Sequence, residues 1–91
     1  MNKIIFTQDL NKVKTACSLI RGKCQFSQKE LAENIGYNET VVSAILNGKR
    51  ELTDSFVKSV HDFGKDYLPA DLLVEQSNVL RRHLYLLALR T

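Results

Sequence analysis

The residues of this chain that are best able to bind a ligand are the charged ones. They are distributed unevenly along the sequence. Residues 1–29 carry six lysine or arginine residues and one acidic residue, Asp9, whereas residues 76–91 carry three arginines and no acid. Most of the acidic residues lie between these segments, in residues 51–75. Basic groups gathered on one side of a protein suit the binding of a polyanion. Chance clustering on a solvated surface is the alternative, because the net charge is only +3.

Patterns typical of catalysis or of metal binding are absent from the sequence. His61 and His83 are isolated in the sequence. We do not expect His61 to contact its neighbour Asp62, because adjacent residues of a helix do not face each other. No glycine-rich phosphate loop, nucleophile elbow or metal-ligand spacing occurs. Cys17 and Cys24 are expected to be reduced, structural thiols rather than a disulfide, a metal site or a redox switch. The sequence therefore predicts neither an enzyme nor a protein with a cofactor.

The length of the chain allows one small domain. Its 91 residues can form a single modest core but are too few for a large enclosed catalytic cleft. No apolar run is long enough to cross a membrane, and residues 1–9 lack the apolar core and cleavage site of a signal peptide. We therefore expect a cytoplasmic protein that is not inserted in a membrane.

A short helix with clear ends is predicted near the middle of the chain. Ser27 and Glu30 have the spacing of a capping box, which starts a helix at residue 28. Apolar residues at helical spacing continue as far as Ile35. Gly36 then supplies the left-handed conformation that a helix end requires. The expected helix covers residues 28–35.

A second short helix is predicted directly after a tight turn. Asn38 can cap it, and Asn47 with Gly48 ends it. Its apolar stripe is expected to consist of Val41, Val42, Ile45 and Leu46. Two capped helices this close together indicate a helix-turn-helix.

The segments before and after this pair predict further helices. One is expected from about Gln8 to Arg21, with Thr7 as its cap and Gly22 at its end. Another is capped by Thr53 and carries apolar residues at helical spacing. Residues 3–6 form the only strand-like run, which we expect to be an arm over the core rather than a strand added to a partner.

A leucine-rich helix is predicted at the end of the chain, from about Ala70 to Leu89, after Pro69. One stripe of this helix consists of Leu73, Leu80, Leu84 and Leu87. A helix with this much leucine needs another surface to bury against. Its own domain and a second copy of the chain are the two surfaces available.

Residues 27–50 resemble the lambda-repressor-like helix-turn-helix family, which includes the Cro/CI and Xre-type regulators. The resemblance is carried by Ser27-Gln28, Glu30-Leu31-Ala32, Ile35-Gly36, Val42 and Asn47-Gly48-Lys49-Arg50. It covers about residues 9–66 and implies a compact all-α domain of four to five helices, with the motif at about residues 27–47. We therefore predict a DNA-binding domain over residues 1–68 and a C-terminal helix over residues 69–91.

The resemblance also implies a site, in which the N-terminal part of the second motif helix enters the major groove of DNA. The residues implied for contacts are Gln28, Asn38, Glu39, Thr40, Ser43, Ala44, Lys49 and Arg50. Thr40 can contact a base, and Ala44 can contact a thymine methyl group. Gln28, Ser43 and Asn38 suit phosphates.

Charged residues complete the implied site. Lys49 and Arg50 follow the second motif helix and are expected to bind phosphates. Glu39 stands where the family often has glutamine. It either accepts a hydrogen bond from a cytosine amino group or stabilises the helix N-terminus by its charge.

The function implied by the resemblance is that of a transcriptional regulator, and specifically a repressor, that binds double-stranded DNA as a homodimer. The C-terminal leucines then belong to the dimer interface. Two alternatives remain open. The last helix could complete the core of its own domain, or the protein could be an antitoxin or adaptor whose last helix binds a different protein. RNA binding is less favoured, because exposed stacking aromatic residues are not apparent.

Overall fold

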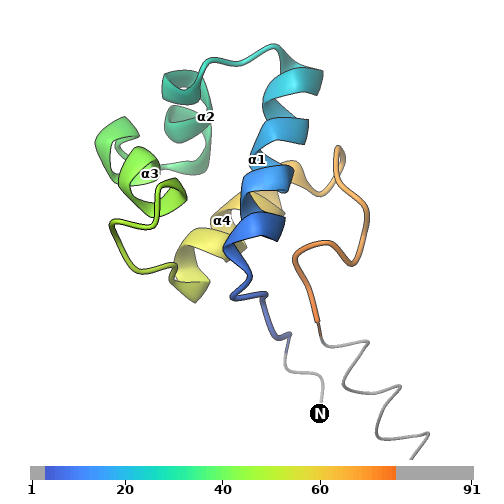
Figure 1. The fold of residues 1–91 in the computed structure, drawn as a ribbon. Helices are drawn as coiled ribbons and strands as arrows, with labels where there is room; N and C mark the ends of the chain where they lie inside the picture. The colour runs from blue at the N-terminus through green and yellow to red at the C-terminus, as the bar shows by residue number, and fades with distance from the viewer. Residues whose placement is uncertain (1–3, 76–91) are drawn as a thin grey trace, which may run out of the picture.

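A computed structural model describes residues 4–75, whose regular secondary structure is all α-helical. The four helices are α1 (Leu10–Cys24), α2 (Gln28–Ile35), α3 (Glu39–Leu46) and α4 (Asp54–Gly64) (Figure 1). The predicted fold class is confirmed. Within residues 4–75, no helix is long and apolar enough to cross a membrane.

Local hydrogen bonds set the ends of α2 and α3 where the sequence predicts them. Ser27 Oγ accepts from the Glu30 amide, and Glu30 Oε1 accepts from the Ser27 amide, each at 3.1 Å. This capping box lowers the pKa of Glu30, because the backbone N–H stabilises the carboxylate. Gly36 ends α2 with φ of 81°, and Asn38 Oδ1 accepts from the Thr40 amide at 2.8 Å to start α3. Both predicted helices are confirmed with their boundaries.

The predicted boundaries of the first helix are wrong at both ends. Asp9, rather than Thr7, caps α1, because its Oδ1 accepts from the Asn11 amide at 2.9 Å. Thr7 is buried, and its Oγ1 accepts from the Asp9 amide. At the other end α1 continues through Gly22 to a left-handed Gln25 with φ of 57°. A glycine costs only about 1 kcal/mol inside a helix, so packing of the surrounding turns overrides it.

The core lies where the four helices meet. Its buried members are Val13, Ala16, Cys17, Ile20, Leu31, Ala32, Ile35, Val42, Ile45, Phe56, Val57, Val60 and Leu73. Gly64 is the last residue of α4 and packs closely against α1, because a Cβ at this position would collide with the Ile20 side chain. Burial raises the pKa of Cys17 to about 11, which keeps the thiol protonated. Both cysteines are free, as expected for structural thiols.

The segment after α4 differs from the prediction of a helix that begins at Ala70. Residues 70–75 contain turns and a single bridge, in which Phe6 pairs antiparallel with Val74. The Thr7 amide donates to the Leu73 carbonyl at 2.9 Å. These pairings hold the backbone extended and place Leu73 in the core with 1 % exposure. The helix prediction is therefore wrong over residues 70–75.

Two further predictions concern this end of the molecule. The expected arm is present in residues 4–6, where Phe6 packs against the core. Leu73, which helical spacing places on the dimer stripe, lies inside the domain instead. The rest of the leucine stripe, Leu80, Leu84 and Leu87, lies outside the described residues.

Candidate nucleic-acid interface

The turn between α2 and α3 is fixed to the core by an aromatic contact. The Tyr37 amide donates to the Ala32 carbonyl at 2.9 Å, which ties Tyr37 to the last turn of α2. Its ring meets the edge of the Phe56 ring, with centroids 5.2 Å apart and planes at 82°. Tyr37, which could equally bind a phosphate from its position in the sequence, therefore acts here as a packing residue.

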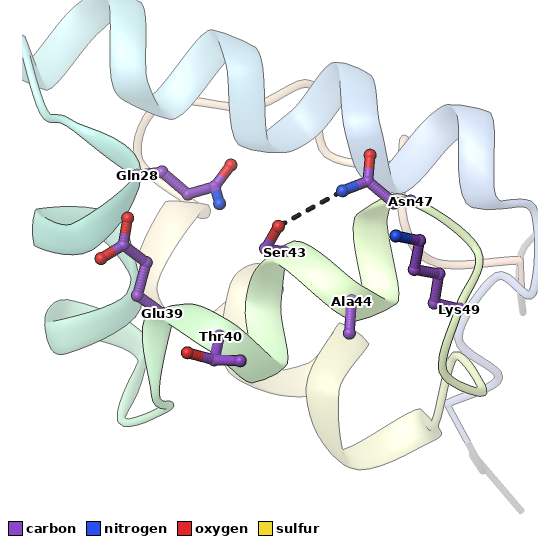
Figure 2. A pocket seen from close by; sticks show the side chains of 7 residues that line it. All are labelled: Gln28, Glu39, Thr40, Ser43, Ala44, Asn47 and Lys49. Atoms are coloured by element: carbon purple, nitrogen blue, oxygen red, sulfur yellow. Dashed lines mark hydrogen bonds between the residues drawn. The ribbon is translucent and has the colours of Figure 1, made fainter.

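One face of α3 is buried and the opposite face is open. Val42 and Ile45 are buried against the other helices. The outward side chains of α3 border an open groove that α2 and the loop after α3 complete (Figure 2). The groove is lined by Gln28, Glu39, Thr40, Ser43, Ala44, Asn47 and Lys49. An open groove lined mainly by polar side chains along one helix can contact one side of an extended ligand.

Six of the eight predicted site residues line this groove, and the other two do not. Asn38 uses its side-chain carbonyl to cap α3. Arg50 borders a different hollow, together with Tyr37, Val41 and Glu51. Val41 also packs against the core, so its apolar side chain is explained without a ligand.

Asn47 is a groove residue whose place in the sequence predicts only the end of a helix. Its Nδ2 donates to Ser43 Oγ at 3.3 Å (Figure 2). This bond orients both side chains, and it leaves the Ser43 hydroxyl hydrogen free to donate toward the groove. The spacing in the sequence could have indicated that Asn47 belongs to the site, because Asn47 is four residues after Ser43 and therefore on the same helix face.

Lys49 and Arg50 are placed by the backbone at the end of α3. Their amides both donate to the Ala44 carbonyl, at 2.8 and 3.2 Å, after Gly48 turns the chain with φ of 75°. Both side chains are exposed. Within residues 4–75, the contacts between basic and acidic side chains join Lys12 to Glu75 and His61 to Asp62 only. The two cations are therefore not neutralised by an acid in this part of the chain. The contact between His61 and Asp62, at 3.4 Å, shows that the expectation of no contact between these adjacent residues is wrong.

Comparison with known proteins identifies the domain to which this groove belongs. Residues 19–63 match the family model described as "Helix-turn-helix", and this range spans α2, α3, α4 and the end of α1. Comparisons with curated proteins and with solved structures gave no significant match. Through residues 19–63 the chain therefore belongs to the Cro/CI- and Xre-type family of helix-turn-helix domains, which bind DNA and regulate transcription.

Proposed function

We propose that this protein binds a specific sequence of double-stranded DNA as a homodimer and acts as a transcriptional repressor. The observation that carries the proposal is the open polar groove along α3, which lies on the face of the motif that enters the major groove in this family. Selection of bound sequences from a random duplex pool tests it. A recurrent half-site, repeated with two-fold symmetry, is the expected result, and a pool without enrichment contradicts sequence-specific binding.

The groove residues suggest how the bases are read. Thr40 is exposed on the first turn of α3 and offers both a hydroxyl and a methyl group to base edges. Ala44 lies one turn further along and suits a thymine methyl group. Ser43, held by Asn47, suits a phosphate oxygen or a base acceptor.

Residues at the border of the groove have positioning roles in this proposal. Gln28 begins α2 and extends into the groove beside Glu39 (Figure 2). There it can reach a phosphate and support α3 at the same time. Glu39 is exposed at the start of α3, where its charge favours the helix N-terminus. Asn38 contributes through its cap, and its amide nitrogen remains available for a phosphate.

The base-reading role of Thr40 is testable by substitution. Thr40→Ala should weaken binding to the selected site by about 1–3 kcal/mol and binding to random duplex much less, because only the selected site offers the matching base. Titrations by fluorescence anisotropy on both duplexes measure the difference. Thr15→Ala is the control, because Thr15 is an exposed threonine of α1 outside the groove. Equal losses on the two duplexes contradict base reading.

The phosphate-binding role of Lys49 and Arg50 predicts a different pattern. The double alanine variant should bind all duplexes more weakly. The slope of log affinity against log salt should flatten by about 0.9 for each phosphate that the variant no longer neutralises. The control variant replaces Lys58 and Lys65, which are exposed but lie outside the groove. An unchanged salt slope in the Lys49/Arg50 variant contradicts the assignment.

A further inference from the structure

A second groove lies beside the N-terminal arm and shares no lining residue with the groove along α3. We call it the arm groove. Its lining includes Ile5, Phe6, Glu51, Leu52, Asp54 and Ser55. The arm therefore forms one wall, and the loop between α3 and α4 with the first turn of α4 forms the other.

The arm groove exposes apolar surface beside acidic side chains. Ile5 is 42 % exposed, and its neighbour Ile4 is 51 % exposed. Glu51 and Asp54 are both exposed on the opposite wall. Neither carboxylate is in an ion pair with a basic residue of the described domain, but Asp54 Oδ1 accepts a hydrogen bond from Gln8 Nε2 across the groove. The second carboxylate oxygen of Asp54 remains available to a cation. A ligand that fits this groove has apolar side chains together with positive charge.

The same chain contains a segment of that composition. Residues 76–91 include five leucines and three arginines, Arg81, Arg82 and Arg90, and no acidic residue. This segment begins directly after Glu75, whose amide donates to the Ile5 carbonyl at 2.8 Å. The segment and the arm groove are therefore complementary in charge and in apolar character.

The direction of the chain decides which copy supplies the segment. The Thr7–Leu73 and Ile5–Glu75 hydrogen bonds show that the chain runs antiparallel to the arm as it leaves the domain (Figure 1). At Glu75 it is level with Ile5 and is heading away from Gln8 and the loop that forms the other wall. To enter its own groove the chain would have to turn back on itself within residues 76–91, which shortens the segment left to fill the groove. A second copy faces no such constraint, and reciprocal exchange of two identical segments closes a two-fold dimer.

We propose that residues 76–91 of a second copy occupy the arm groove. Their arginines pair with Glu51 and Asp54, and their leucines cover Ile5 and Leu52. The inference rests on the homodimer proposed above and names the surface that receives the C-terminal segment. It also connects assembly to DNA binding, because Glu51 and Leu52 immediately follow Lys49 and Arg50 in the sequence.

Charge reversal on the two sides tests this pairing. The groove variant combines Glu51→Lys with Asp54→Lys, and the segment variant combines Arg81→Glu with Arg82→Glu. Each alone should raise the dimer dissociation constant by about 100-fold or more, because like charges then face each other. Co-expressed together, the two variants should form a heterodimer of near wild-type stability, since both exchanged contacts are again complementary. Sedimentation velocity measures each species.

Controls separate this pairing from general effects of charge. The Asp66→Lys/Asp71→Lys variant makes the same change at exposed acids outside the groove and should dimerise like the wild type. If circular dichroism shows that Asp54→Lys disturbs α4, a variant with Glu51→Lys and Ser55→Lys reverses the charge of the groove without replacing Asp54. A half-site duplex titrated with the groove variant checks α3 independently of assembly. The variant should bind this duplex at least as tightly as the wild type, because the new lysines lie close to Lys49 and Arg50 in the sequence and add positive charge.

Each remaining outcome has a definite meaning. A groove variant that stays dimeric overturns the arm-groove inference and leaves the proposed homodimer standing. Rescue in a single chain that carries all four reversals, without rescue in the mixture, places the segment in its own groove and overturns the exchange. A wild-type chain that remains monomeric overturns both the inference and the proposed homodimer.

Discussion

Replacement of Phe56 with alanine is expected to lower the free energy of unfolding by about 3–5 kcal/mol. Phe56 is 0 % exposed and lies at the centre of the core, where its ring supports Tyr37 in the turn before α3. This loss would remove a large fraction of the free energy of unfolding of a small domain, which is about 5–15 kcal/mol in total. Urea denaturation followed by circular dichroism measures it.

The same substitution should also disturb the groove along α3, because the turn before α3 packs against the Phe56 ring. Without the Phe56 ring, Tyr37 loses its packing partner and the start of α3 loses its support. Tyr37→Phe is the matched control, because it keeps the edge-to-face contact and should remain near wild type in stability. A Phe56→Ala variant that loses less than about 1 kcal/mol would contradict the central role of this ring in the core.

Replacement of Leu84 with aspartate is expected to split the proposed dimer. Leu84 shares one predicted helix face with Leu80 and Leu87, and a charge there is costly in a buried interface. The domain itself should stay folded, because the buried cluster of residues 4–75 draws on all four helices and Leu73. Tight binding to a two-half-site operator should fall by about 10²–10⁴-fold, because two linked sites then act separately.

The measurements for Leu84→Asp combine assembly and binding. Sedimentation at about 10 µM, roughly the range where a functional dimer should persist, compares the variant with the wild type. In the dimer the two recognition helices are expected to lie roughly 34 Å apart, which matches successive major grooves. Asn78→Asp, which places the same charge on the opposite face of the predicted helix, is the control. A Leu84→Asp variant that unfolds completely would instead assign this residue to the core of its own domain.

Local signals in the sequence determine the helix-turn-helix. The Ser27–Glu30 box, Gly36 and Asn38 are each satisfied within a few residues by hydrogen bonds of the same short segment. The boundaries of α2 and α3 therefore follow from the sequence alone. The same holds for the start of α4, whose Thr53 cap accepts from the Phe56 amide at 3.2 Å. The outward face of α3 follows from helical spacing, and with it most of the candidate site.

Tertiary structure decides the features that depend on distant partners. The chain after Pro69 has the periodicity of a helix, but Thr7 and Ile5, more than sixty residues away in the sequence, supply backbone partners that hold residues 73–75 beside the arm instead. Leu73 thereby enters the core, although its spacing places it on a dimer stripe. Helical periodicity records only neighbours along the chain, so it cannot register this pairing. Arg50 lies outside the α3 groove for a different reason: after the turn at Gly48 it borders another hollow, together with Tyr37 and Val41.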